Sequence, residues 1–228
     1  MKTAGLIIFA IFLLPLQQEK EYAKQREAMV KKQIESRGIK DSATLAAMRK
    51  VPRHLFVPKD QMVHAYEDRP LPIGWGQTIS QPYIVAYMTE VIKPKANFRV
   101  LEIGSGSGYQ AAVLSEIVKE VYTIEIIETL GKEASARLSK LNYKNVQTKT
   151  ADGYHGWKEK APFDAIMVTA AAEYIPPPLI EQLKDGGRMI IPVGTPFMTQ
   201  QLMLVEKTGN KTRTTSLIPV RFVPFKRN

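Results

Sequence analysis

The chain has 228 residues, enough for one large domain, and its 44% hydrophobic content is sufficient for a buried core. It contains no cysteine, which excludes disulfides, thiolate metal sites and a cysteine nucleophile. The 32 basic and 22 acidic residues give a net charge of +10, but no block of five basic residues occurs, so we interpret the charge as solvated surface attractive to anionic peptides and expect no nucleic-acid partner.

An apolar run covers residues 4–16, directly after Lys2. Its 13 residues are fewer than the roughly 20 needed to span a bilayer, and they match the length of a signal-peptide core. No pair of small residues for cleavage follows Leu16. Residues 1–18 are therefore set apart as a possible signal or anchor, with an apolar start to the first helix as the other alternative. Residues 19–228 are expected to form a single domain.

Helical spacing of apolar residues predicts a first helix over residues 19–37, ended by Gly38. A second helix is predicted at 43–50, with Asp41 or Ser42 as its N-cap and Pro52 after its end. Residues 53–58 indicate an extended or turn segment.

Residues 66–82 are rich in proline, glycine and polar side chains, which predicts a long loop. The loop also carries apolar residues that a solvated linker would not need, and such loops are usually functional. A helix is expected to begin at Pro82. Thr78 and Ser80 would then lie just before its N-terminus, where hydroxyls and backbone N–H groups can hold a carboxylate. The alternative is that Ser80 only caps the helix.

The segment Val100-Leu-Glu-Ile-Gly-Ser-Gly-Ser-Gly108 predicts a buried strand that ends in a glycine-rich loop, with a helix from Tyr109 to about Val118. A strand, a glycine loop and a helix in succession are typical of a nucleotide-type cofactor site. Tyr109 occupies the position where a dinucleotide fingerprint has glycine. The spacing instead resembles the Glu/Asp-x-Gly-x-Gly-x-Gly loop of class I S-adenosylmethionine-dependent methyltransferases. A plain strand-to-helix turn remains the alternative.

Two acidic residues are predicted at the ends of the next strands. Glu125 lies near the end of a strand at 121–126, where its carboxylate could accept both hydroxyls of a ribose. Asp152 follows a strand at 146–150 and could accept an adenine amino group, with an Asx turn as the alternative.

Further strands at 163–171 and 188–193 alternate with helices, which predicts a doubly wound, mostly parallel α/β sheet. Ligands of such sheets bind at the carboxyl ends of the strands, where the glycine loop, Glu125 and Asp152 all lie. Strands at 201–206 and 215–224 predict an antiparallel C-terminal region. No grouping of His, Asp and Glu has metal-ligand spacing, so we expect no metal and interpret His54, His64 and His155 as structural or surface residues.

The chain closely resembles the protein-L-isoaspartate (D-aspartate) O-methyltransferase family, over about residues 25–224. The resemblance rests on the segments 70–82, 100–109, 152–153, 163–171, 186–187 and 220–224. It implies a Rossmann-like fold with N-terminal helices. It also implies transfer of a methyl group from S-adenosylmethionine to the α-carboxyl of L-isoaspartyl and D-aspartyl residues in damaged proteins. The ester then collapses to a succinimide that can reopen to aspartate.

The resemblance also assigns roles to individual residues. Ser80 and Thr78 would hold the substrate carboxylate. The implied cofactor-binding residues are Glu102, Gly104, Ser105, Gly106 and Gly108 for the methionine part, Glu125 for the ribose, and Asp152 with Gly153 for the adenine. The implied substrate-binding residues are Ile79, Gln81, Val220 and Arg221, with a weaker argument for Gln201.

Two other functions stay open from the residues alone. One is a methyltransferase acting on a small molecule or RNA, and the other is a non-catalytic adenosyl-binding module. We expect a cytoplasmic protein because S-adenosylmethionine is a cytosolic metabolite. We also expect the protein to be a monomer. An exported or membrane-tethered form, with membrane contact through residues 4–16, is the alternative.

Overall fold

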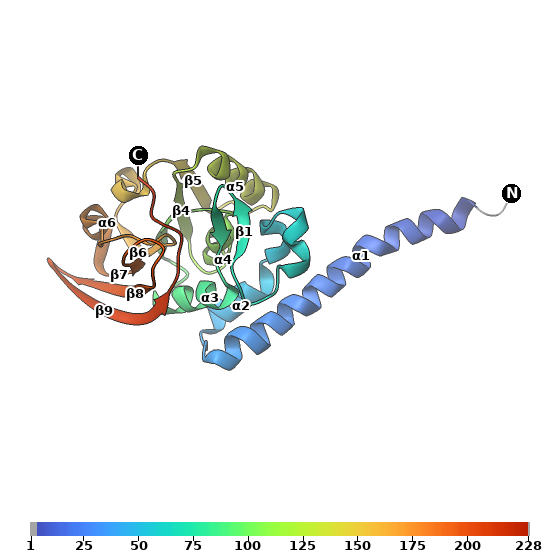
Figure 1. Ribbon diagram of the computed structural model, residues 1–228, viewed down its shortest axis with the longest axis horizontal. Helices are drawn as coiled ribbons and strands as arrows, with labels where there is room; N and C mark the ends of the chain where they lie inside the picture. The colour runs from blue at the N-terminus through green and yellow to red at the C-terminus, as the bar shows by residue number, and fades with distance from the viewer. Residues whose placement is uncertain (1–3, 228) are drawn as a thin grey trace.

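A seven-stranded sheet forms the centre of the molecule in the computed structural model, which describes residues 4–227, with side chains from residue 17 onward (Figure 1). The strand order is β5-β4-β3-β6-β7-β8-β9. The first five strands of that order run parallel, and β8 and β9 add antiparallel pairs beside β7. The bounds are β3 Arg99–Ile103, β4 Glu120–Glu125, β5 Val146–Thr150, β6 Phe163–Val168, β7 Leu183–Val193, β8 Gln200–Thr208 and β9 Lys211–Val220. The predicted fold class is confirmed.

The chain winds outward from the centre of the sheet in both directions. From β3 it proceeds to β4 and β5, then returns across the sheet to add β6 and β7 on the other side of β3. The order therefore reverses between β3 and β6, and a ligand crevice is expected at the carboxyl ends of these two strands.

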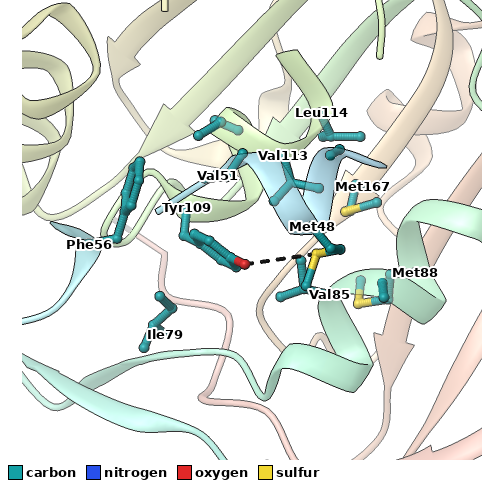
Figure 2. Packing of buried hydrophobic residues seen from close by; sticks show 14 of the residues in the cluster. Met48, Val51, Phe56, Ile79, Val85, Met88, Tyr109, Val113, Leu114 and Met167 are labelled. Atoms are coloured by element: carbon teal, nitrogen blue, oxygen red, sulfur yellow. Dashed lines mark hydrogen bonds between the residues drawn. The ribbon is translucent and has the colours of Figure 1, made fainter. Parts of the chain in front are cut away.

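Each face of the sheet has its own core because successive residues of a strand point to opposite faces. On one face, Val100 and Met167 pack with residues of α2, α3, α4 and α5 (Figure 2). On the other face, Leu101 and Ile166 pack with Leu179 of α6. The helix bounds are α2 Ser42–Lys50, α3 Pro82–Val91, α4 Tyr109–Ser115, α5 Glu128–Lys140 and α6 Pro177–Gln182.

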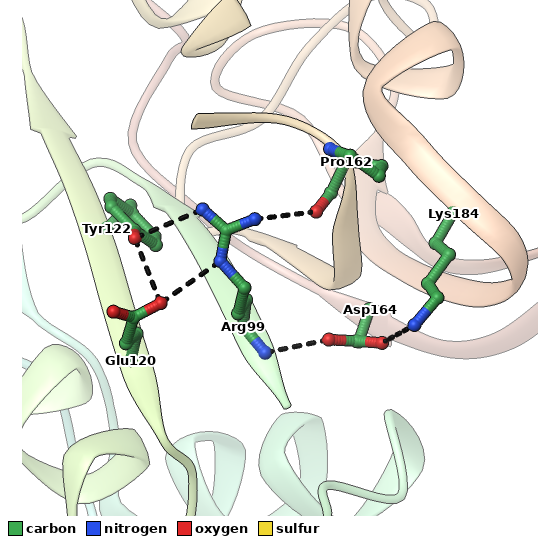
Figure 3. A network of polar contacts seen from close by, with 6 residues as sticks. All are labelled: Arg99, Glu120, Tyr122, Pro162, Asp164 and Lys184. Atoms are coloured by element: carbon green, nitrogen blue, oxygen red, sulfur yellow. Dashed lines mark hydrogen bonds and ion pairs between the residues drawn. The ribbon is translucent and has the colours of Figure 1, made fainter. Parts of the chain in front are cut away.

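A polar network joins the amino-terminal ends of the central strands (Figure 3). Arg99 on β3 pairs with Glu120 on β4 at 3.0 Å, and its backbone N–H donates to Asp164 on β6. Lys184 on β7 completes the network with an ion pair of 2.9 Å to Asp164. These contacts fix the edge of the sheet opposite the carboxyl ends, which remain available for ligands.

The N-terminal helices agree with the prediction and extend it. Helix α1, Ala4–Met29, runs outward from the domain (Figure 1) and continues through a π-helical turn and a 3₁₀ turn to Gly38, which has a φ of 97°. Asp41 is the N-cap of α2, since its carboxylate accepts from the Thr44 N–H at 2.7 Å. Within residues 4–227, no helix has the length and apolar character needed to cross a membrane.

Several local predictions were wrong. Of the two alternatives for residues 53–58, an extended or a turn segment, the structure has a 3₁₀ turn at 53–56. The predicted loop contains a hairpin of β1 (Leu71–Gly74) and β2 (Gln77–Ile79), because alternate apolar residues there are buried. Strand β7 begins at Leu183, five residues before the predicted start at 188. The last strand is Lys211–Val220 rather than 215–224, and Pro224 instead bridges Ala171.

Candidate active site

The glycine loop leaves β3 through a backbone shape that requires glycine. Gly104 has a φ of 97°, and a Cβ placed on it would lie 2.5 Å from Oγ1 of Thr169. The Gly104 N–H donates to the Ile124 carbonyl at 2.8 Å, which holds the loop against β4. Gly106 and Gly108 also have positive φ. Gly108 packs on Leu138 and forms the N-cap of α4, so it shapes the loop without lining a cavity.

Glu125 is held by the backbone of two loops. Its Oε2 accepts from the Gly106 N–H at 2.8 Å, and its Oε1 accepts from the Ile127 N–H at 3.0 Å. Each carboxylate oxygen can accept a further hydrogen bond. The side chain lines a hollow together with Gly104, Gly106 and Gly153. A fixed, doubly accepting carboxylate of this kind fits the two hydroxyls of a ribose.

Glu102 is a fully buried carboxyl group beside the same loop. Its Oε2 accepts from the Thr123 hydroxyl, whereas Oε1 has no hydrogen-bond partner among the described residues. Burial raises the pKa of Glu102 to about 8; the Thr123 hydrogen bond opposes this shift, and the negative charge of Glu125 adds to it. The side chain lines a small hollow with Ser105 and Thr78. An unpaired buried acceptor needs a donor, and a ligand ammonium group would satisfy it.

Asp152 uses its carboxylate within the protein. Its Oδ1 accepts from the Tyr154 N–H at 2.9 Å, which is the Asx-type contact, and its Oδ2 pairs with Arg227 at 2.8 Å. Gly153, in contrast, lines the hollow beside Glu125. A Cβ on Gly153 would lie 2.3 Å from Cγ2 of Ile103, so only glycine lets this turn approach β3 so closely.

Thr78 and Ser80 border a cavity of about 420 Å³ whose wall also includes Val220 and Arg221. Thr78 and Thr169 line this cavity as well as both hollows of the glycine loop. The hollows beside the glycine loop and the cavity of about 420 Å³ therefore meet at these two threonines.

Ser80 is held by its backbone, and its side chain caps no helix. Helix α3 has Gln81 at its N-cap and no side-chain capping bond, so the alternative role of Ser80 as a cap is wrong. The carboxylate of Asp68 instead accepts from the Tyr83 N–H at 3.1 Å in the first turn. The Ser80 carbonyl accepts from Nη2 of Arg53 at 2.7 Å, which leaves the hydroxyl available beside the cavity.

A family model described as "Protein-L-isoaspartate(D-aspartate) O-methyltransferase" matches residues 24–228. The chain belongs to this family. It is a protein-repair methyltransferase, and its methyl donor is S-adenosylmethionine. A non-catalytic adenosyl-binding module, the alternative from another class, is therefore excluded.

Curated relatives and solved structures agree with the family match. The chain is 59% identical to a protein-L-isoaspartate O-methyltransferase of Opitutus terrae, covering 92% of this chain and 90% of that protein. It is 56% identical to protein-L-isoaspartate O-methyltransferase 1 of Nitrosospira multiformis, covering 97% and 95%.

Two solved structures share the fold. A structure titled protein-L-isoaspartate O-methyltransferase superposes with a TM-score of 0.81 at 30% identity, covering 89% of this chain and 66% of that one. A putative protein-L-isoaspartate O-methyltransferase from Plasmodium falciparum, in complex with S-adenosyl-L-homocysteine, gives a TM-score of 0.77 at 26% identity, covering 89% and 99%.

The remaining predicted residues of this methyltransferase are divided between the cavity and other places. Gln81 lines the cavity, and its Nε2 donates to the Asp68 carboxylate at 2.7 Å. Ile79 is buried in the core but also lines the Glu102 hollow. Gln201 lies outside these cavities and accepts from the Ser216 hydroxyl at 3.3 Å. His54 is buried against Tyr66.

Sequence reasoning missed two residues that organise the site. Thr169 donates to the Gly104 carbonyl at 2.7 Å and borders all three spaces. Its signal was visible, because it is a polar residue that directly follows the apolar run of β6, Ala165 to Val168. Arg53 is fully buried, with its Nε donating to the Ala65 carbonyl at 2.9 Å. No local pattern indicates that an arginine in this position is buried.

Proposed function

We propose that the chain carries out its family's reaction with Ser80 and Thr78 holding the free carboxylate of the damaged residue, which is the α-carboxylate of an L-isoaspartyl residue or the β-carboxylate of a D-aspartyl residue. The observation that carries this proposal is the shared border: Thr78 lines both the cavity of about 420 Å³ and the glycine-loop hollows. A carboxylate held there would lie next to a methyl donor bound by the loop.

The cofactor residues follow from the hydrogen-bonding groups of the site. S-adenosylmethionine supplies an electrophilic methyl group on a sulfonium when it is bound. Glu125 would accept the two ribose hydroxyls, while Glu102, Ser105 and the glycine loop would face the methionine part. Asp152 and Gly153 would hold the adenine, with the Arg227 contact of Asp152 forming the outer side of that subsite.

The chemistry requires positioning more than proton transfer. An isoaspartyl carboxylate is already ionised at neutral pH, so the nucleophile needs no strong general base. Alignment of a carboxylate oxygen with the methyl group would supply most of the rate enhancement. The protein's part is then to fix the carboxylate, and the Arg53 contact with the Ser80 carbonyl restrains the backbone that carries the serine. Ile79, Gln81, Val220 and Arg221 would shape the space for the rest of the residue.

Replacement of Ser80 by alanine tests this assignment. We expect kcat/KM for an isoaspartyl peptide to fall by about 10²-fold, as a misplaced reactant can cost that much. Affinity for S-adenosylhomocysteine should stay within twofold in calorimetry. Ser115→Ala is the matched control, because that hydroxyl bonds only within α4, to the Ala112 carbonyl. Wild-type turnover in Ser80→Ala would contradict the role.

The domain limits, the oligomeric state and the location of the chain belong to the same proposal. We propose that residues 19–228 act as a single monomeric methyltransferase domain in the cytoplasm, where the cofactor is made, without a nucleic-acid partner. Residues 1–18 would be a separate N-terminal segment. Cell fractionation with N-terminal sequencing tests the location: a membrane-bound chain, or an exported chain starting near residue 17–24, would contradict it. Light scattering tests the monomer.

A further inference from the structure

We propose that Phe197 and Met198 form a docking surface for an apolar side chain of the substrate polypeptide, next to the isoaspartyl residue in sequence. The two residues lie in the connection between β7 and β8, residues 194–199, which we call the rim loop. The inference rests on the proposed function, since it adds a recognition surface to the same cavity.

The exposure of the rim loop is unusual for its side chains. Phe197 is 84% exposed and Met198 is 62% exposed. Phe197 also has a φ of 64°, a left-handed conformation that glycine and asparagine adopt more readily than an aromatic residue. A strained, exposed aromatic next to an exposed methionine indicates an interaction site more than a solvated turn.

The rim loop is tied to the wall of the substrate cavity. Thr199, its last residue, lines the cavity of about 420 Å³ together with Thr78 and Ser80. Gln200 is only 1% exposed, and its Nε2 donates to the Met198 carbonyl at 2.7 Å. Its Oε1 accepts from the N–H of Phe222, another residue of the cavity wall, at 2.9 Å. Gln200 therefore ties the backbone of Met198 to the wall of the cavity, and the rim loop lies beside that wall.

The occupant follows from the size of the cavity and the nature of the substrate. A volume of this order holds a small ligand. When the isoaspartyl residue of a polypeptide lies in the cavity, its neighbouring residues therefore lie outside, where the rim loop can contact them. Apolar contacts at such a rim favour apolar neighbours in the substrate, and aromatic residues and methionine are enriched at protein recognition surfaces. Damaged, unfolded chains expose such side chains, whereas compact folded proteins bury them.

The test uses the full chain and two isoaspartyl peptides that differ only in having leucine or serine beside the isoaspartyl residue. We expect the KM of the wild type to be roughly tenfold lower for the leucine peptide than for the serine peptide. Phe197→Asn keeps the left-handed backbone and removes the ring. The double variant Phe197→Asn, Met198→Ser should raise the KM for the leucine peptide to that for the serine peptide, and kcat should stay unchanged.

Val63→Ser is the matched control, because Val63 is an apolar residue that is 72% exposed on a 3₁₀ helix away from the cavity. It should leave both KM values unchanged. Equal KM values for both peptides in the wild type, or equal changes for both in the double variant, would overturn the rim-loop proposal while leaving the proposed function intact. Failure of the wild type to methylate either peptide would overturn the proposed function first and this inference with it.

Discussion

At the scale of single residues, the site depends on carboxyl groups whose surroundings set their charge. Glu125 accepts hydrogen bonds from two backbone N–H groups, whereas Glu102 lies fully buried with one oxygen unpaired among the described residues. The two carboxyl groups beside the same glycine loop thus have different surroundings. In the proposed function, Glu125 would accept from the neutral ribose hydroxyls and Glu102 from a cationic donor.

The buried Glu102 predicts a pH-dependent stability of the cofactor-free protein. Its pKa is raised from the ordinary 4.5 to about 8, so the folded state retains a proton that the unfolded chain releases. Its contribution is fully present below pH 4.5 and is lost as the pH rises to 8, at up to ~1.4 kcal/mol per pH unit. Glu102→Gln should remove this slope in urea titrations at pH 5 to 8.

The same variant should bind S-adenosylhomocysteine about tenfold more weakly, because an amide cannot lose a proton and form a charged pair with the ammonium group as the Glu102 carboxyl can. Thr148→Val is a suitable control, since Thr148 on β5 donates to Ser135 on α5. A wild-type pH slope in Glu102→Gln would contradict the raised pKa of Glu102.

At the scale of elements, the buried Arg53 joins three segments of the chain, one of which carries Ser80 of the cavity wall. Arg53 on its 3₁₀ helix bonds the carbonyls of Ala65 and Ser80, and its guanidinium lies 4.8 Å from the ring centroid of Tyr109 on α4. Burial lowers the pKa of Arg53 to about 10, with the nearby tyrosines opposing the shift, so it remains charged at neutral pH. Arg53 thus holds the connection between β2 and α3, which carries Ser80.

Arg53→Met should destabilise the protein by about 2–4 kcal/mol, because two buried carbonyls lose their donor. We expect kcat/KM for the peptide to fall at least tenfold and the affinity for S-adenosylhomocysteine to stay unchanged. Arg53→Lys, which keeps the charge and can reach one carbonyl, should give an intermediate loss. Arg49→Met is the control, as Arg49 pairs with Glu27 and Glu35 at the surface. Equal losses of peptide and cofactor affinity would indicate a purely structural role.

The elements also show which features a single sequence can reveal. The strands β3, β4, β6 and β7 were predictable because each contains a short apolar run, and β3, β4 and β7 also end at a glycine or an acidic residue. The hairpin at 71–79 was missed because its prolines and glycines obscure the alternation of buried Leu71 and Ile73. The pairing of Asp152 with Arg227 joins residues 75 positions apart, and no local pattern predicts such a contact.

At the scale of the whole molecule, the doubly wound sheet brings two binding regions to one edge. The cofactor region comes from the glycine loop, β4 and the turn after β5, and the substrate cavity comes from the hairpin and the segment after β9. Segments more than a hundred residues apart therefore meet at Thr78 and Thr169. In the proposed function, the hairpin and the segment after β9 would hold the substrate carboxylate at this meeting point.

The most direct test of the central claim is methyl transfer to a matched pair of peptides. One peptide carries an isoaspartyl residue and the other carries aspartate at the same position, so they differ only in which carboxyl group joins the backbone. With radiolabelled S-adenosylmethionine, we predict labelling of the isoaspartyl peptide at least 10²-fold faster than of its aspartyl twin, because only the former places a free α-carboxylate beside Ser80. Equal labelling of the two peptides, or labelling of neither, would contradict the account.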